Sequence, residues 1–334
     1  MNKKLAILSI GLLLPIFSSC ASNKEEKTIL SYGTYFDREA REISGDKLYD
    51  KKDNENFILA TYGDTSCGCW NNFSKVINYV CANNNLLIYK MDEKQIDDRL
   101  NNFGLKHSDD PAFYIIANKK IIKSYFYVDN PDIFGNERKF YQEILQQIDK
   151  PYIYLINEEQ ITSKVYADGG ILYFMRESCP DCSYCTPNVL IPYLTDKKPN
   201  DIIYAFDLDP IKNAGDNDKY QAFKDNYHLS DVNDAAYGYG SGYVPMFQHI
   251  NQGVIDDGLV YFNDTIADGE ITQSYFSNER KDNLHYLDGL EKKILIGTNI
   301  DSSKLNSFGS WASLDIQNEY YQPFLEAFLN YYLN

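Results

Sequence analysis

Histidine, tryptophan and positive charge are scarce in this chain of 334 residues. It has four histidines and two tryptophans, and 32 lysines and arginines stand against 48 aspartates and glutamates, giving a formal net charge of −16. Nucleic acid and anionic lipid headgroups repel so acidic a protein, so neither is expected as a partner. The histidines lie at no ligand-like spacing, so the sequence predicts no metal centre, and nothing in it indicates a cofactor.

Long apolar runs are also absent beyond residue 17, so no internal membrane helix is expected. Lys3 and Lys4 precede the apolar run 5–17, which is typical of a secretory signal. The run ends in Phe17-Ser18-Ser19-Cys20, which resembles a bacterial lipobox. The resemblance implies that Cys20 is lipidated and anchors an extracytoplasmic protein to the cell membrane. An ordinary signal peptide, with Cys20 incidental, is the alternative.

Six cysteines remain after Cys20, and most of them are clustered. Cys67 and Cys69 form one group, and the second group contains Cys179, Cys182 and Cys185. Disulfides persist outside the cytoplasm, where thiol chemistry is therefore plausible. Scattered cysteines would indicate structural bridges, whereas this clustering indicates a reactive site.

Hydrophobic periodicity divides the chain into four parts. Residues 1–19 form the signal peptide, 20–50 contain the lipidated cysteine and a tether, and 51–150 and 151–334 form two α/β domains. In residues 51–150 the pattern predicts strand, helix, strand, helix, hairpin and helix. The same order recurs in the second part, where strands are expected at 171–175, 202–206 and 246–250 and a helix from about residue 317.

The two domains align over a short window without a gap. Residues 58–69 fall on residues 171–182 at a constant offset of 113 (171 − 58), which places Cys69 on Cys182 and Ser66 on Cys179. The sequence therefore suggests a duplication. In it, the first copy has lost one cysteine of the pair and is a degenerate, accessory domain.

Cys179-Pro180-Asp181-Cys182 lies between a predicted strand and a predicted helix. Two thiols at this spacing close a small disulfide, and the positive end of the helix favours the thiolate of the first cysteine. The thiolate attacks a disulfide, and its neighbour resolves the resulting mixed disulfide. A structural disulfide or metal ligation at this pair is the alternative.

This pattern resembles the thioredoxin-like superfamily, with two domains in tandem that each contain a central mixed sheet flanked by helices. The resemblance rests on the cysteine motif and on Pro111 and Pro245, each before a predicted hairpin. It implies that Cys179 is the nucleophile, Cys182 the resolving thiol and Pro245 the cis-proline that presents backbone to a substrate. The spacing to Pro245 also implies an insertion of about 21 residues, expected within 215–242.

Three positions depart from the family pattern. Ser178 replaces the usual tryptophan, Tyr173 replaces the buried acid found in many thioredoxins, and Asp181 opposes thiolate formation. A proton-relay role therefore cannot be assigned to residue 173, and the direction of electron flow stays open.

The remaining candidates are accessory. Cys185 is expected to be a spare thiol or an alternate resolving partner. Cys67 and Cys69 are candidate accessory thiols, and a disulfide between them would be strained and easily reduced. Cys81 is expected in the core. Four acidic residues are expected to form a solvated loop rather than a calcium site: Asp207, Asp209, Asp216 and Asp218.

The sequence thus favours a membrane-anchored thiol–disulfide oxidoreductase. Its partners would be the thiols or disulfides of exported proteins and a membrane redox protein. The alternative is a non-enzymatic binding or assembly module with structural disulfides, similar to the thioredoxin-like accessory proteins of bacteriocin export.

Overall fold

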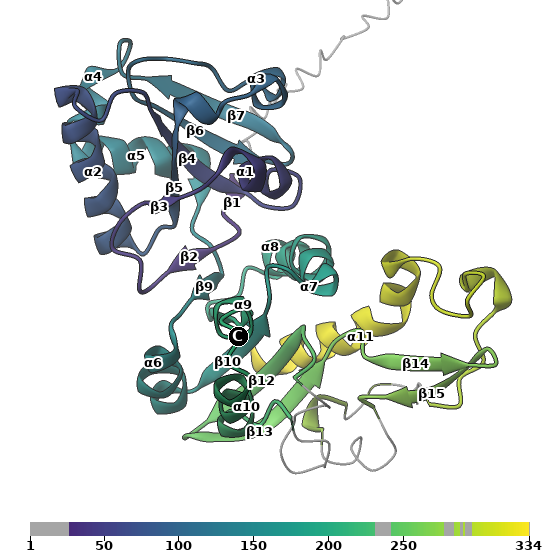
Figure 1. Cartoon of the computed structure of the whole chain (residues 1–334). Helices are drawn as coiled ribbons and strands as arrows, with labels where there is room; N and C mark the ends of the chain where they lie inside the picture. Colours follow the sequence, from purple (N-terminus) through teal and green to yellow (C-terminus); the bar gives the residue numbers. More distant parts are fainter. Residues whose placement is uncertain (1–26, 231–241, 277–283, 288–289, 291–295, 334) are drawn as a thin grey trace, which may run out of the picture.

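The computed structural model describes residues 27–230, 242–276, 284–287, 290 and 296–333. The predicted signal peptide and Cys20 lie outside these residues. The chain forms two units, each built around one mixed sheet (Figure 1). We call residues 41–149 the first unit and residues 150–333 the second unit. No helix in the described part of the chain is both long and apolar enough to cross a membrane.

The first unit contains a five-stranded sheet in the order β3-β5-β4-β6-β7. The central strand β4 (Phe57–Tyr62) pairs in parallel with β5 (Ile88–Asp92) and antiparallel with β6 (Ala112–Ala117). Strand β7 (Lys120–Phe126) completes a hairpin with β6, and β3 (Arg41–Glu42) pairs with β5. All six residues of β6 are buried, as expected for a central strand covered on both faces.

Helices cover both faces of this sheet. Phe73 of α2 (Gly68–Asn84) packs with Phe113 of β6 and Phe140 of α5 (Glu137–Gln147) on one face. Leu48 and Leu100 belong to the core of the other face. The shorter elements of the unit are α1 (Gly45–Lys51), η1 (Glu93–Gln95), α3 (Asp98–Phe103) and α4 (Pro131–Phe134).

The second unit repeats this topology in a six-stranded sheet of order β13-β12-β10-β11-β9-β2. Its central strand is β10, which pairs in parallel with β11 and antiparallel with β12. The strands are β10 (Gly170–Met175), β11 (Ile203–Asp207), β12 (Met246–Asn251), β13 (Val254–Val260), β9 (Ile153–Leu155) and β2 (Gly33–Thr34).

Alternate side chains of β10 enter two different aromatic clusters. Tyr173 stacks on Phe247, which contacts Phe328 of α11 (Leu314–Tyr332). Phe174 contacts Phe223 of α10 (Asn217–Asn226) on the opposite face. This alternation follows from the two-residue period of a strand.

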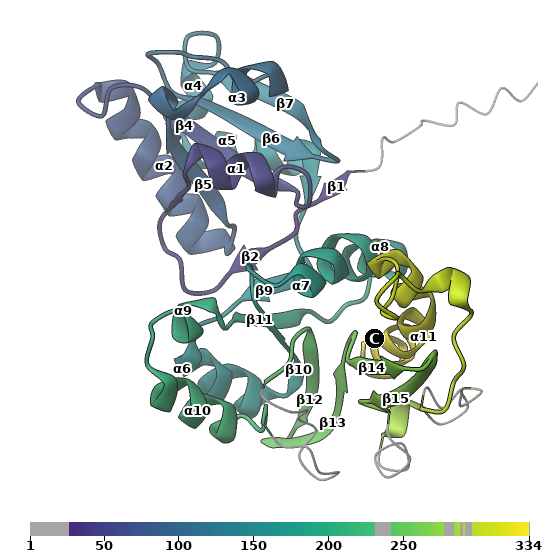
Figure 2. The ribbon, with the colours of Figure 1, turned by 45° about the vertical axis from the view of Figure 1, so that its right-hand side comes forward.

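One continuous helical stretch follows β10 and lies on the side of the second unit that faces the first unit (Figures 1 and 2). It contains α7 (Pro180–Cys185), the π-helical turn η3 (Thr186–Leu190) and α8 (Ile191–Lys197). The remaining elements of the unit are α6 (Glu158–Gln160), η2 (Ile161–Tyr166), α9 (Asp209–Lys212), β14 (Asp264–Ala267), β15 (Glu270–Ser274), η5 (His285–Leu287) and η6 (Ser302–Lys304).

The predicted mixed α/β class is confirmed, and the two units share one order of elements. Strands β4 and β10 begin at Phe57 and Gly170, which are 113 positions apart (170 − 57). The connection to the next antiparallel strand is longer in the second unit. From the end of β11 to the start of β12 it spans 39 positions (246 − 207), whereas from the end of β5 to the start of β6 it spans 20 (112 − 92). This longer segment contains α9 and α10, where the first unit has η1 and α3, and residues 231–241 of the expected insertion lie outside the described residues.

Residues 27–50 differ from the expected tether. Strand β1 (Thr28–Ile29) pairs with β8 (Ile148–Asp149), β2 extends the second sheet, and β3 extends the first. Leu30 and Tyr32 are buried between these pairings. The segment therefore joins both units, because its backbone N–H and C=O groups form hydrogen bonds with strands of the first unit and of the second unit.

Candidate functional site

The predicted nucleophile lies where the central strand of the second unit gives way to a helix. Cys179 is the N-cap of α7, with extended backbone angles, and Pro180 is the first helical residue. Proline fits this position because its missing N–H would have no partner in the first turn. Cys179 is 9% exposed, so its sulfur lies just below the surface.

Pro245 lies beside Cys179. The Val244–Pro245 peptide bond is the one cis bond in the described part of the chain. It places the Val244 carbonyl oxygen 3.7 Å from the Cys179 sulfur. The Pro245 carbonyl accepts a hydrogen bond from the Tyr261 amide, which ties this loop to the end of β13. The structure therefore brings the predicted nucleophile and the predicted platform proline together.

The pKa values of the two thiols in the motif are shifted in opposite directions. A hydrogen bond from the Cys182 thiol, with further help from backbone N–H groups, lowers the pKa of Cys179 to about 6 despite partial burial and the charge of Asp181. Burial raises the pKa of Cys182 well above its usual value. Both are free thiols in this structure. Such a pair has one ready nucleophile and one thiol held in reserve.

Asp209 fastens the loop that leads to Cys179. Its carboxylate accepts hydrogen bonds from the Arg176 guanidinium at 3.0 Å, the Ser178 hydroxyl at 2.7 Å and the Ser178 amide at 2.6 Å. Because β10 and β11 are parallel, their carboxyl ends meet at one edge of the sheet, where Asp209 reaches this loop. Burial opposes ionisation of Asp209, but the hydrogen bonds from Ser178 and Arg176 outweigh it and lower the pKa of the carboxyl.

The expected solvated acidic loop is therefore wrong for two of its four members. Asp209 is 9% exposed, and the Asp207 carboxylate accepts from the amides of Glu177 and Asp209. Burial raises the pKa of Asp207 to about 6. Asp216 instead caps α10, and Asp218 lies exposed in its first turn. Sequence reasoning missed the loop contact, although carboxylates after a parallel strand were a signal for it.

Tyr173 is fully buried beneath the motif. Its hydroxyl lies 3.0 Å from the Thr186 hydroxyl, and burial raises its pKa well above the usual value. Tyr32 belongs to the segment that joins the units, and its hydroxyl contacts the sulfur of Met175 at the end of β10.

A cavity of about 550 Å³ reaches Cys182 from the side of the N-terminal segment. Lys51 and Glu55 line it and form an ion pair at 2.7 Å, while Tyr32 and Asp207 line it from other elements. Burial raises the pKa of Glu55, although Lys51 opposes the shift. Residues from outside the second unit therefore line the cavity beside Cys182.

The two other free thiols in the described part of the chain, Cys185 of α7 and Cys81 of α2, are buried. Cys185 is fully buried and Cys81 is 1% exposed, and neither forms a disulfide. Burial raises the pKa of Cys185 strongly and that of Cys81 to about 12. Cys81 is thus a core thiol, and Cys185 is a spare one in this state.

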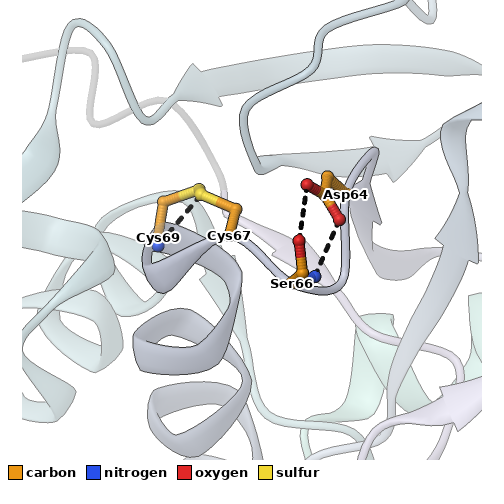
Figure 3. The surroundings of a disulfide bond; sticks show 4 residues. All are labelled: Asp64, Ser66, Cys67 and Cys69. Atoms are coloured by element: carbon orange, nitrogen blue, oxygen red, sulfur yellow. Dashed lines mark hydrogen bonds between the residues drawn. A yellow bond between two sulfur atoms is a disulfide. The ribbon is translucent and has the colours of Figure 1, made fainter.

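The first unit carries a disulfide at the corresponding place (Figure 3). Cys67 is the N-cap of α2, is bonded to Cys69, and accepts a hydrogen bond from the Cys69 amide. Ser66, which aligns with Cys179, is held by Asp64 through both its amide and its hydroxyl at 2.8 Å. The N-cap position that Cys179 occupies in the second unit is held here by Cys67, one residue after Ser66, and its sulfur is bonded in the disulfide, so this unit has no free thiol at that position.

Asp110 is a neighbour of this disulfide that sequence reasoning missed. One carboxylate oxygen and the two sulfurs all lie within 4.8 Å of one another. Asp110 precedes Pro111, and this peptide bond is trans, so the cis-proline that the family resemblance implied occurs at Pro245 and not here. The antiparallel pairing of Thr61 with Ala112 brings the two loops together.

Comparisons with known proteins bear only on the fold. No family model matches this chain, and no curated protein matches it. Among solved structures, a point mutant of the thioredoxin from Halobacterium salinarum is 17% identical, with 35% of this chain and 97% of that chain covered and a TM-score of 0.28.

Two multidomain structures are also similar. Human ERp44 form I is 10% identical over 78% of this chain and 54% of that chain, with a TM-score of 0.34. The first two thioredoxin domains of Saccharomyces cerevisiae Eps1p are 8% identical over 54% of this chain and 80% of that chain, with a TM-score of 0.22. The chain thus spans about half of ERp44. These neighbours are thioredoxin-like proteins, but likenesses this weak carry no argument about function.

Proposed function

We propose that this protein is an extracytoplasmic thiol–disulfide oxidoreductase, with two thioredoxin-like units and one active cysteine pair. One observation carries the proposal: Cys179 caps α7, its sulfur lies 3.7 Å from the Val244 carbonyl at the cis-proline loop, and its pKa is lowered to about 6. A thiol used only for structure has no need of this acidity or of a cis-proline loop beside it.

The first step is attack by the Cys179 thiolate on one sulfur of a substrate disulfide. A new bond forms between the Cys179 sulfur and that substrate sulfur, and the other substrate sulfur leaves as a thiolate and takes up a proton. The backbone at Val244 and Pro245 would pair with the substrate chain and hold its disulfide in line with the thiolate.

The second step uses Cys182. After losing its proton, Cys182 attacks the Cys179 sulfur, and the substrate leaves with its second thiol. The products are a reduced substrate and a Cys179–Cys182 disulfide, so two electrons have passed from the protein to the substrate. The same steps in reverse oxidise a substrate dithiol. A membrane redox protein would reset the pair.

The anchor is part of the same proposal. Cys20 would carry the lipid, which places the active pair at the outer face of the cell membrane among exported proteins. Expression of the full chain with a radiolabelled fatty acid tests this directly. The label should enter the wild-type protein and be lost in Cys20→Ala, while a protein that is secreted without label would contradict the anchor.

The activity is tested with Cys179→Ser. This variant should lose insulin reduction and dithiol oxidation, because serine is not ionised at neutral pH and does not attack sulfur. Cys81→Ser is the matched control, since Cys81 is also a buried free thiol but lies in the other unit. Unchanged turnover in Cys179→Ser would refute the assignment and favour the binding-module alternative.

A further inference from the structure

We propose that the first unit contains a redox-gated metal site, in which reduced Cys67 and Cys69 and the carboxylate of Asp110 bind a thiophilic divalent cation such as Zn²⁺. The inference is independent of the activity proposed for Cys179. It starts from the three ligand atoms that approach within 4.8 Å of one another at the N-terminus of α2.

The spacing of these atoms suits a tetrahedral ion. Around zinc, with metal–sulfur bonds of about 2.3 Å, neighbouring ligand atoms lie roughly 3.5–3.8 Å apart. The Asp110 carboxylate oxygen lies within 4.8 Å of both sulfurs, and once the disulfide is reduced the two sulfurs can separate toward this spacing by side-chain rotation. Two thiolates and one carboxylate supply three ligands, and water would complete the four, as in zinc sites that keep an open position.

The backbone holds the ligands in place from two directions. Cys67 and Cys69 begin α2 after β4, whereas Asp110 belongs to the loop before β6. A methyl group at Gly63 would come within 3.0 Å of the Asp109 backbone, so the two loops are packed against each other. A ligand set drawn from two fixed loops is preorganised, which lowers the entropy lost on binding.

Local charge also favours a cation. Asp64 and Asp109 lie in the same two loops as the ligands, and the basic residue whose charge acts on Asp64 is Lys94. Hydrogen bonds from Ser66 lower the pKa of Asp64, which keeps it ionised at neutral pH. Reduction of the disulfide would leave two thiols next to these carboxylates, and a bound cation would offset the repulsion that develops when the thiols lose their protons.

The residue before the proline of this loop differs between the two units. The residue before Pro245 is Val244, which presents a carbonyl oxygen to Cys179 and has no ligating side chain. The residue before Pro111 is Asp110, whose carboxylate faces the two sulfurs. The same position in the fold thus lies beside a single nucleophile in one unit and completes a ligand set in the other.

Gating follows from the chemistry of the sulfurs. The disulfide of Figure 3 has no thiolate to offer a metal. A dithiol reductant would transfer two electrons and two protons, itself becoming a disulfide, and leave two thiols at Cys67 and Cys69. Metal binding would then release the two thiol protons, so affinity should rise with pH.

The test uses Co²⁺ as a spectroscopic probe for the site. Residues 21–334 carrying Cys179→Ser and Cys182→Ser are reduced with a dithiol without oxygen, freed of reductant and titrated with Co²⁺. We expect a sulfur-to-cobalt charge-transfer band and tetrahedral ligand-field bands at one equivalent, both removed by Zn²⁺. The oxidised protein should show neither band.

Three variants decide the ligand assignment. Cys67→Ser should abolish the charge-transfer band, and Asp110→Asn should weaken binding by about tenfold or more. Asp109→Asn, in the adjacent position, is the matched control and should bind as tightly as the parent. No band in the reduced parent, or equal affinity in Asp110→Asn and Asp109→Asn, would overturn the proposal. Far-ultraviolet circular dichroism verifies that each variant is folded.

Discussion

The two units differ in the side chains at one shared place in the fold, where the helix after the central strand begins. We call this place the corner of each unit. In both, a helix begins after the central parallel strand, opposite the loop that leads into the antiparallel hairpin. The second unit has a free, acidic thiol at this corner, and the first has a serine and a closed disulfide. Topology therefore provides the corner, and three or four side chains determine its chemistry.

The loops before the helices are also held by different means. In the first unit Asp64 binds Ser66 two residues away, which is a local turn. In the second unit Asp209 reaches across from the end of β11 to hold Arg176 and Ser178.

The largest expected effect concerns the resolving thiols. Cys182→Ser should reduce turnover by about a hundredfold or more and should accumulate a mixed disulfide at Cys179, because the second attack is lost. Cys69→Ser, at the aligned position of the first unit, should leave turnover near that of wild type. Insulin reduction and nonreducing mass spectrometry measure both. Equal losses in the two variants would show that both units exchange disulfides.

The next effect separates the cysteines by their acidity. In the reduced protein, alkylation of Cys179 should rise about tenfold per pH unit below its pKa of about 6 and level off above it, because the thiolate is the reacting form. Asp181→Asn should move the midpoint down, since the charge of Asp181 raises this pKa. Cys182 and Cys185 should stay slow throughout. Iodoacetamide labelling with peptide mapping gives the profile, and a midpoint near the usual thiol value of about 8.5 would contradict it.

A moderate effect is expected at the fastened loop. Asp209→Asn removes the charge that pairs with Arg176 and should lower the free energy of unfolding by about 2 kcal/mol. It should also lower turnover, because the loop before Cys179 loses an anchor. Urea unfolding and insulin reduction measure the two effects. Asp218→Asn on α10 is the control, and the same loss there would remove the special role of Asp209.

The smallest effect probes the ion pair that lines the cavity beside Cys182. Glu55→Gln weakens the buried pair with Lys51 and should lower the free energy of unfolding by about 1 kcal/mol, since Glu177 lies 3.9 Å from the same ammonium group. Asp132→Asn breaks an exposed pair with Lys139 and should have no measurable effect. Urea unfolding compares them, and equal stabilities would show that the Lys51–Glu55 pair contributes nothing.

The sequence by itself determined the strands, the helices that follow them and the place of the cysteine motif. Strands β10, β11 and β12 were predicted within one residue of their ends, because buried strands in a mixed sheet are short apolar runs bounded by turns. The position of Cys179 at a helix start followed from the same pattern, with Pro180 as the first helical residue.

Tertiary structure alone decided which polar side chains complete each corner. Asp209 and Ser178 are 31 residues apart and Asp110 and Cys67 are 43 apart, and only strand pairing makes them neighbours. The short strands of residues 27–50 were also invisible, because two-residue strands have no period to detect. Local periodicity reports the burial of one segment, whereas a functional site depends on the register between segments.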